Sequence, residues 1–186
     1  MIDQTEIKTA TIADAAFIRD LQRQFTNEIG FVPTSATERE LMKNNIVMGT
    51  LAGMAAGFVF VQPVLAAQPR TACIIQAAVR MDAQRRHVGL ALVEHVAARA
   101  LHIGSTILQA KCLDGLEAND FWKAAGFTEI LRTNGGTSRG QKLIWWRRAL
   151  IPGAAISRIP LTTRTRRPGG RFTHRTPPNT IPLFPE

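Results

Sequence analysis

The sequence predicts an α/β fold, and three observations support that prediction. First, segments that alternate like strands are interleaved with segments of helical spacing along residues 5–146. Second, a charge-free run of 22 residues, Ile46 to Ala67, is interrupted by Ala52-Gly53, as expected of a β-hairpin. Third, a short basic loop, Gln84 to Ala91, joins an apolar strand to a helix. The predicted order of elements is β-α-α-β-β-β-α-β-α-β-β.

The first half of the chain predicts a strand, two helices and the two strands of the hairpin. Apolar residues at helical spacing indicate the first helix, and Thr37 with Glu40 resembles a capping box for the second. In chain order, the five elements are Glu6 to Ile12, Asp14 to Phe25, Thr37 to Asn44, Ile46 to Leu51 and Met54 to Val64.

The charge-free run has a second interpretation, because its length alone would allow it to span a membrane. Its glycines, Pro63 and its clusters of β-branched residues favour a buried hairpin instead. We therefore expect no contact with a membrane.

The second half predicts two helices and four strands. The helix after the basic loop presents Val88, Leu92, Val96 and Ala100 on one face, and the next helix ends at Gly126, a suitable C-cap. The strands are Thr71 to Val79, Thr106 to Leu113, one that begins at Phe127, and Lys142 to Trp146. The last strand is apolar enough to form the edge of a homodimer, although packing in the core explains it equally well.

We expect one domain, residues 1–146, followed by a tail, residues 147–186. The tail contains eight arginines and one acidic residue, so it carries most of the net charge of +9. Its prolines rule out long helices, and we expect a disordered arm. Such an arm would make weak, non-specific contact with a polyanion such as nucleic acid. The alternative is a solvated extension that has no partner.

The two cysteines, Cys73 and Cys112, do not form a disulfide framework, and no spacing of His and Cys suggests a metal site. The first twelve residues carry both kinds of charge and no apolar run, so we expect no signal peptide. These features predict a cytoplasmic protein with reduced thiols. A reactive role stays open, but buried structural thiols are the better interpretation.

The basic loop predicts an anion site. A helix N-terminus presents unsatisfied N–H groups and a partial positive charge, Arg85 and Arg86 add full charges, and Gly89 lets the backbone come close. The loop is neither a GxxxxGK phosphate loop nor the GxGxxG fingerprint of dinucleotide sites. The alternative is a basic turn that caps an ordinary helix.

Two motifs point to a family. Arg86-x-x-Gly89-x-Ala91 resembles the Q/R-x-x-G-x-G/A signature of the GNAT superfamily of acyl-CoA-dependent N-acyltransferases. Asn119, Phe121-Trp122 and Gly126-Phe127 resemble the family block N-x-x-A-x-x-F-Y-x-x-x-G-F, with compressed spacing and Trp122 in place of the tyrosine. Core packing also accounts for Phe121 and Trp122. The order of elements resembles the GNAT fold across residues 5–146.

The resemblance implies a mixed, mostly antiparallel central sheet flanked by helices, with two parallel strands splayed at the acyl-CoA site. It implies acetyl-CoA as cosubstrate and the transfer of its acetyl group directly to a primary amine, whose identity stays open. The backbone near Ala78 and Val79 would hold the pantetheine, and Asn119, otherwise a helix-start residue, would hydrogen-bond to it. The cofactor-binding residues implied in this way are Ala78, Val79, Arg80, Arg85, Arg86, His87, Val88, Gly89, Leu90, Ala91, Asn119 and Trp122.

Catalytic groups are harder to assign. The chain has no tyrosine, and Trp122 stands closest to the family's thiolate-protonating tyrosine, as a wall of the acyl site or a hydrogen-bond donor. Glu117 and Asp114 are candidate general bases, and a proton relay through solvent is equally reasonable. On the strand Thr71 to Val79, Gln76 is the polar candidate.

The resemblance also implies where the acceptor binds, namely at the Phe25 to Thr37 connection and the Asn134-Gly135-Gly136 turn. Glu28, Glu38 and Glu40 could attract a cationic amine, although acids on helix surfaces are usually solvated. A competing hypothesis is a non-catalytic GNAT-like module that binds coenzyme A or docks on nucleic acid through the arginine-rich tail.

Overall fold

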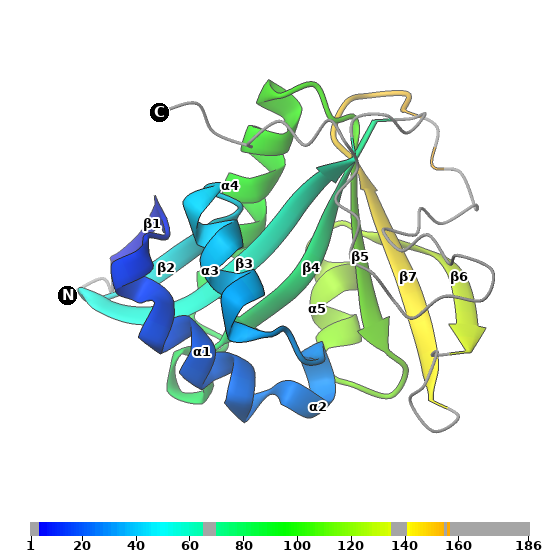
Figure 1. Ribbon diagram of the computed structural model, residues 1–186. Coiled ribbons are helices and arrows are strands. Elements are labelled where there is room, and N and C mark those ends of the chain that lie inside the picture. The colour runs from blue at the N-terminus through cyan, green and yellow to red at the C-terminus, as the bar shows by residue number, and fades with distance from the viewer. Residues whose placement is uncertain (1–3, 65–69, 135–140, 155, 157–186) are drawn as a thin grey trace, which may run out of the picture.

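The computed structural model describes residues 4–64, 70–134, 141–154 and 156. Seven strands form one mixed sheet in the order β1-β2-β3-β4-β5-β7-β6 (Figure 1). Among the described residues, neighbouring strands are antiparallel except β4 and β5, which are parallel. The strands are β1 (Thr5–Thr9), β2 (Ile46–Leu51), β3 (Met54–Val64), β4 (Thr71–Val79), β5 (Ile107–Leu113), β6 (Thr128–Asn134) and β7 (Lys142–Ala149).

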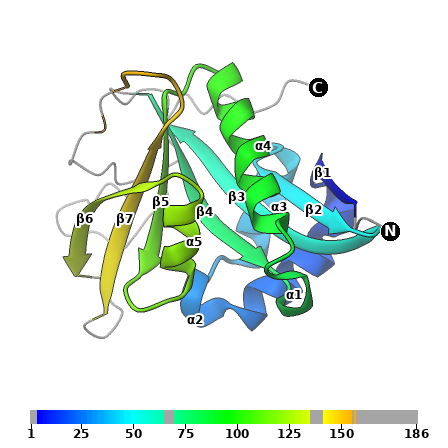
Figure 2. The same ribbon diagram turned by 180° about the vertical axis from the view of Figure 1, so that it is seen from behind.

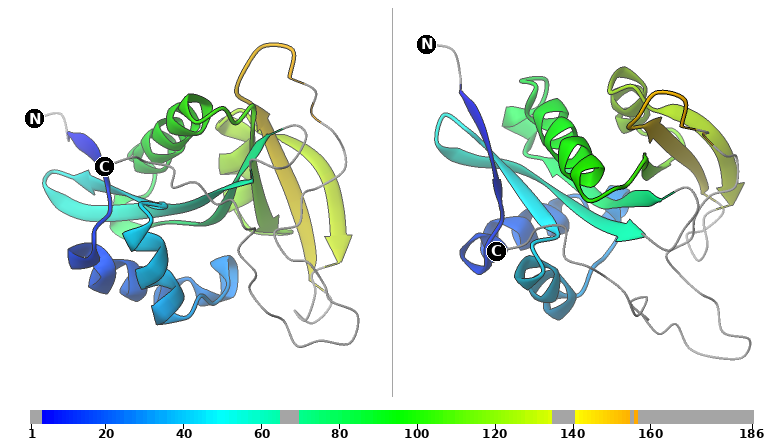
Figure 3. Two further views of the ribbon diagram at one scale, coloured as in Figure 1. Left: turned by 45° about the horizontal axis from the view of Figure 1, so that its top comes forward. Right: turned by 90° about the horizontal axis from the view of Figure 1, so that it is seen from above.

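Helices cover both faces of the sheet. α1 (Ala15–Gln24), α2 (Thr26–Ile29) and α3 (Thr34–Met42) lie on one face. α4 (Val88–His102) and α5 (Ala118–Ala124) lie on the other (Figure 2). The view from above shows these three layers (Figure 3). Two short 3₁₀ turns, η1 (Ile12–Asp14) and η2 (Met81–Ala83), precede α1 and α4.

Each side of the sheet has its own hydrophobic core. The α4 side buries the face of α4 that includes Val88, Leu92 and Val96 against β2, β3 and β4. The α1 side packs Ile18 and Leu21 against aromatic side chains of β3. The predicted α/β fold with a mostly antiparallel sheet is therefore confirmed.

The predicted hairpin is also confirmed. β2 pairs with β3, and the connecting residues Ala52 and Gly53 have φ of 50° and 78°, as the primed turns of tight hairpins require. The run lacks charges because these central strands are covered on both faces. No helix in the described parts of the chain is long and apolar enough to cross a membrane.

The capping box predicted at Thr37 and Glu40 is wrong. α3 begins three residues earlier, at Thr34, and both residues are buried inside it. Glu40 Oε2 accepts a hydrogen bond of 2.8 Å from Asn45, and Thr37 faces Gln22 of α1. These two polar side chains therefore make tertiary contacts and do not cap a helix.

A capping box does occur at another place. The Thr11 backbone N–H donates to Asp14 Oδ2 at 2.8 Å, and together these residues shape η1 before α1 begins. The first strand therefore ends at Thr9 rather than Ile12, whose side chain is exposed. Burial of Asp14 raises its pKa, but hydrogen bonds from Thr11 and Lys8 outweigh burial, so the net pKa is lowered.

The last strand extends beyond the boundary that we expected at residue 146. β7 continues to Ala149, and Arg147 on it is only 1% exposed, with its Nε donating to Gln109 Oε1 at 2.9 Å. From the sequence we assigned Arg147 to the basic tail. Its burial depends on Gln109, which is distant in the chain, so the sequence around Arg147 gives no sign of it. Residues 157–186 and the turn at residues 135–136 lie outside the described residues.

We predict that Gly57→Ala destabilises the protein by roughly 1–3 kcal/mol. A Cβ at Gly57 would lie 2.7 Å from the Ala78 carbonyl oxygen, so β3 and β4 would have to move apart. The control is Gly49→Ala, whose Cβ would meet only side-chain atoms, at 3.2–3.4 Å, that can shift. Urea unfolding should show the larger loss for Gly57→Ala, and equal losses would contradict this reading.

Candidate functional site

β4 and β5 separate after a short parallel ladder. They pair at only three positions, the last of which joins Cys73 to Gln109, although β4 continues to Val79 and β5 to Leu113. The two strands visibly diverge beyond this pair (Figure 1). We call residues 74–79 and 110–113 the fork. The backbone edges that face each other across it do not bond to one another, which confirms the predicted splay.

A β-bulge lies in β4 just beyond the last parallel pair. Phe60 is opposite Gln76 and Val61 is opposite Ile74, so Ile75 is an extra residue on β4. A bulge bends its strand and redirects the side chains that follow. Ile75 packs with the α1 side, and Gln76, which is 3% exposed, also bonds to that side.

Gln76 is the centre of a buried polar network. Its Oε1 accepts a hydrogen bond of 2.7 Å from Gln22 of α1, and its Nε2 donates to the Gly30 carbonyl at 2.7 Å. Gln22 Nε2 also lies 3.3 Å from Thr37 Oγ1 of α3. The network ties α1, the end of α2 and α3 to the bulge. The sequence identified Gln76 as a polar candidate but did not reveal its partners, which lie 46 to 54 residues away.

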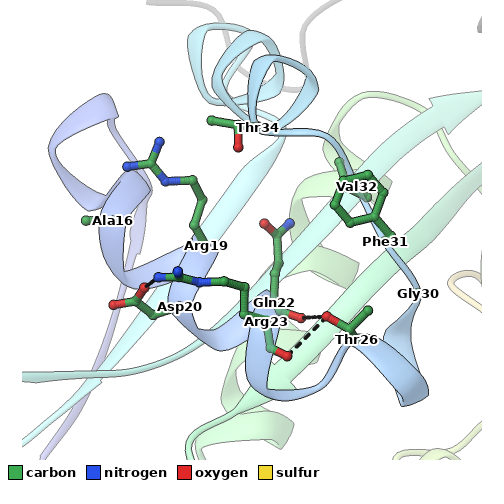
Figure 4. A pocket seen from close by; sticks show the side chains of 10 residues that line it. All are labelled: Ala16, Arg19, Asp20, Gln22, Arg23, Thr26, Gly30, Phe31, Val32 and Thr34. Atoms are coloured by element: carbon green, nitrogen blue, oxygen red, sulfur yellow. Dashed lines mark hydrogen bonds and ion pairs between the residues drawn. The ribbon is translucent and has the colours of Figure 1, made fainter.

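A pocket of about 460 Å³ lies between α1 and the segment that joins α2 to α3 (Figure 4). It is lined by parts of the connection where we expected the acceptor, including Gly30 and Phe31. No strand residue lines it, but Gln22 does, and Gln22 donates a hydrogen bond to Gln76 of the fork. Its charged lining is paired, because Arg23 bonds Asp20 and Arg19 bonds Glu38.

The three candidate acids for attracting an amine differ in their surroundings. Glu38 pairs with Arg19 at 3.3 Å, and Glu40 is buried between Lys43, Arg39 and Asn45. Glu28, on α2, is exposed. The carboxylates of Glu38 and Glu40 are therefore already paired with basic side chains of the same domain.

The basic loop bends sharply before α4. Arg85 and His87 have φ of 58° and 62°, a left-handed conformation that costs energy for residues other than glycine. His87 is the N-cap of α4, and its side chain makes no capping hydrogen bond. The first N–H groups of α4, from Val88 to Leu90, have no partner within the helix by geometry. The loop therefore has the backbone of an anion site.

Side chains around the loop are partly engaged. Arg85 is 89% exposed and lies 3.7 Å from the carboxylate of Glu117, which is 96% exposed. Arg80 pairs with Asp82 at 2.6 Å, and the Val79 carbonyl accepts a hydrogen bond from Gln84 at 3.1 Å. Glu117 thus stands beside the loop, in water. The role of Glu117 as a general base stays a prediction. Its exposed position beside Arg85 does not favour that role.

Gly89 lies in the first turn of α4 rather than in the loop. A Cβ on it would come within 3.2 Å of the Phe121 ring and 3.6 Å of Val79. The close approach that Gly89 permits here is that of α5 to α4. Val88 is buried beneath the turn, and Leu90 is 38% exposed.

The aromatic block around α5 belongs to the core. Trp122 is 5% exposed and makes edge-to-face contacts with Phe121 and Phe127, with ring centroids 5.2 and 5.1 Å away. Asn119 donates to the Leu113 and Leu116 carbonyls at 2.8 and 2.9 Å and accepts from the Trp146 indole at 3.0 Å. Binding of pantetheine by Asn119 stays a prediction and would require exchange of one of these bonds.

Both cysteines are buried and free. Burial raises the pKa of Cys73 to about 11, even though Lys111, Arg147 and Gln109 act in the opposite direction. Burial also raises the pKa of Cys112 to about 11, against a hydrogen bond from Trp122. Both thiols are therefore protonated at neutral pH. Among the described residues, no three His, Cys, Asp or Glu side chains are grouped to hold a metal ion.

We predict that Gln76→Leu loosens the α2–α3 connection. The change leaves the Gly30 carbonyl and the Gln22 amide without their partner, which costs roughly 1–3 kcal/mol. Hydrogen exchange of residues 25–33 should become faster, while exchange in α4 stays unchanged. Gln24→Leu, at an exposed position of α1, is the control. Unchanged exchange at residues 25–33 in Gln76→Leu would show that the network does not hold this segment.

The thiols also predict how stability depends on pH. An unfolded cysteine ionises near pH 8.5, whereas each folded thiol has a pKa of about 11. Above about pH 8.5 the unfolded state therefore releases protons that the folded state keeps, so stability falls as pH rises. The loss is at most about 2 kcal/mol per thiol at about pH 10. Urea unfolding at neutral and alkaline pH should show this loss in the parent protein and a smaller one in a Cys73→Ala, Cys112→Ala variant.

Comparison with known proteins agrees with this geometry. The profile of the acetyltransferase (GNAT) family matches residues 12–127, more than half of the chain. A search of curated protein sequences gives no match. Several hundred solved chains have a similar fold.

Three of these structures are informative. yncA from Salmonella typhimurium, solved with acetyl-CoA, has a TM-score of 0.66 and 17% identity, covering 83% of this chain and 98% of its own. The ribosomal-protein-S18-alanine N-acetyltransferase from Escherichia coli has a TM-score of 0.62 and 20% identity, covering 83% and 99%. N-acetylglutamate synthase from Neisseria gonorrhoeae, complexed with coenzyme A and N-acetyl-glutamate, has a TM-score of 0.65 and 17% identity, covering 80% and 35%.

At these identities the solved structures show the shared fold, and the profile match shows the family. The chain therefore belongs to the GNAT family of acetyltransferases.

Proposed function

We propose that this protein transfers the acetyl group of acetyl-CoA to the nitrogen of a primary amine in one direct step. The observation that carries the proposal is that two features are adjacent in the chain. The end of β4, whose edge toward β5 is unpaired, leads within nine residues into the strained loop and the uncapped start of α4. One element therefore offers an open strand edge and the next offers an anion site.

The donor would lie along this continuous path. Its pyrophosphate would bind at the first N–H groups of α4, where Arg85 and Arg86 add charge. Its pantetheine would lie along β4 near Ala78 and Val79, like an added strand. The Val79 carbonyl would then exchange its bond from Gln84 for one from the ligand. The thioester would reach the bulge at Ile75 and Gln76, where a backbone N–H could polarise its carbonyl.

Direct transfer is supported by the state of the thiols. A two-step route would need an activated nucleophile, and a cysteine must ionise to act as one. Cys73 and Cys112 are buried with pKa values of about 11. An acyl-cysteine intermediate is therefore disfavoured, and the amine attacks the thioester itself.

Nitrogen as the acceptor atom is supported by the proteins of similar fold. One acts on the alanine of a ribosomal protein, and another forms N-acetyl-glutamate. These acceptors differ in size from a protein to an amino acid, so the fold alone does not select one. We place the acceptor on the α1 side of the sheet, where the network of Gln76 meets the pocket.

We predict that acetyl-CoA raises the melting temperature, because a ligand that binds only the native state stabilises it. Release of free thiol with a panel of small amines, amino acids and peptide N-termini then tests for transfer. Arg85→Ala and Arg86→Ala should each weaken acetyl-CoA binding about 10-fold, as expected for loss of a charged hydrogen bond. Arg39→Ala, which removes an exposed positive charge from α3 on the other side of the sheet, is the control. Unchanged binding in both loop variants would show that the loop does not hold the donor.

A non-catalytic role is the second candidate, because two family features are missing. Trp122 stands where the family has a tyrosine, and β4 contains no carboxylate. A module that docks on nucleic acid would shift DNA at low salt and lose the shift when residues 157–186 are removed, a truncation that preserves β7. Thiol release with any amine would favour the enzyme.

A further inference from the structure

Lys111 lies on β5 near the point where the fork begins. It is the second residue of β5 beyond the last parallel pair, and the bulge at Ile75 is at the same level on β4. Side chains alternate along a strand, so Lys111 shares a face of the sheet with Gln109 rather than with the core residue Ala110. This is the α1 side, because Leu108, Ala110 and Cys112, which alternate with Lys111 along β5, belong to the α4-side core. Lys111 is also exposed, so a ligand in the fork can reach it.

In the ligand-free chain the ammonium group of Lys111 contacts β7, the neighbour of β5 on the side away from β4, so it would have to turn across β5 to reach a ligand in the fork. The Lys111 Nζ lies 4.7 Å from the centre of the Trp145 ring, and Trp145 is directly opposite Lys111 on β7. The face of an indole attracts a cation, which keeps the lysine charge above the sheet. Burial raises the pKa of the Cys73 thiol at the last parallel pair, and the positive charge of Lys111 partly opposes that rise, so the ammonium group lies within electrostatic range of the point where the strands part.

We propose that Lys111 is a catalytic residue whose ammonium group stabilises the sulfur of coenzyme A as the thioester bond breaks. This proposal rests on the proposed function and adds the group that the sequence did not reveal. A tyrosine is absent from the chain, and the Trp122 side chain is buried and bonded to Cys112. Lys111 supplies a full positive charge at the level of the bulge instead.

The chemistry balances without a further reagent. The neutral amine nitrogen attacks the thioester carbon and forms the C–N bond, and the C–S bond breaks with its electron pair passing to sulfur. The nitrogen loses its extra proton to water. Lys111 keeps its own proton and donates a hydrogen bond to the thiolate. A nearby cation also favours the neutral form of the acceptor amine, which is the form that attacks.

Other charged groups around Lys111 bear on its effect. β7 contributes Arg147, which also lowers the pKa of Cys73 and so adds positive charge. α2, which contacts β5, contributes the exposed Glu28, and Asp114 at the end of β5 is paired with Arg132 at 3.0 Å. Cys73 itself is protonated at neutral pH. Among the described residues named here, the positive charges of Lys111 and Arg147 therefore outnumber the exposed carboxylate of Glu28.

The test needs no knowledge of the acceptor. Binding of coenzyme A and of its desulfo analogue, which lacks the thiol, is measured by calorimetry from neutral to alkaline pH. In the parent protein we expect the bound thiol to have a pKa about one unit below that of free coenzyme A, seen as a pH dependence that the analogue lacks. Lys111→Met should abolish this difference, and Lys111→Arg should preserve it. Lys123→Met, at an exposed lysine of α5, is the matched control.

The outcomes separate the two proposals. If neither coenzyme A nor the analogue binds the parent protein, the proposed function fails. If both bind and Lys111→Met leaves the pKa of the bound thiol unchanged, the role of Lys111 alone is overturned. Once an acceptor is known, Lys111→Met should lower kcat by about 10²-fold and leave the KM for acetyl-CoA unchanged, while Lys111→Arg keeps most of the rate. An equal loss in Lys111→Arg would contradict a role for the charge.

Discussion

The short parallel ladder between β4 and β5 is the constraint on which the rest of this structure depends. Two strands of a sheet can part only if each stays paired on its other side, since an unpaired buried backbone is costly. β4 is paired with β3 up to Val79, and β5 is paired with β7 at all seven of its residues. Each strand of the fork is thus hydrogen-bonded to its outer neighbour, β4 to β3 and β5 to β7. A ligand that completes the inner edges would add hydrogen bonds without breaking those of the sheet.

Buried polar groups shape the α1 side of the fork. A bulge places Gln76 in the core, where an amide is tolerated only if its donors and acceptor are satisfied. Gln22 and the carbonyl of Gly30 satisfy it, and through them the position of α2 depends on the bulge. The geometry that parts the strands therefore also positions the segment beside the proposed acceptor pocket. One irregularity in one strand therefore links the proposed donor site to the proposed acceptor site.

The positive charges near the fork match the negative groups of the proposed donor, acetyl-CoA. Acetyl-CoA carries negative charge on its phosphates, and its sulfur develops negative charge as the thioester breaks. The uncapped start of α4 and Arg85 stand at one end of the proposed path of the donor, and Lys111 stands at the other. The stretch of β4 between them, from Ala77 to Val79, is apolar, as suits a pantetheine arm. Strain at Arg85 and His87 is consistent with a loop shaped for a ligand.

By itself, the sequence determined what depends on local order. Alternation, helical spacing and the Ala52-Gly53 turn predicted the α/β class and the hairpin, because these patterns follow from the periods of strands and helices. The motif at Arg86, Gly89 and Ala91 predicted the family. Local rules failed where a distant partner decided the outcome, as at Thr37 and Glu40, which looked like a cap until burial against α1 and Asn45 explained them.

Only the tertiary structure decided which residues meet. Arg147 looked like the start of a basic tail, but its pairing with Gln109 across β5 and β7 makes it part of the core. The role of Gly89 in admitting a phosphate stays a prediction, and the structure adds that its missing side chain lets Phe121 approach α4. The sequence did not predict a role for Lys111, because nothing in the neighbouring residues distinguishes it from any other lysine on a strand. Its importance arises from β4 leaving β5 beside it, and such a departure is a property of the sheet, not of any segment of the chain.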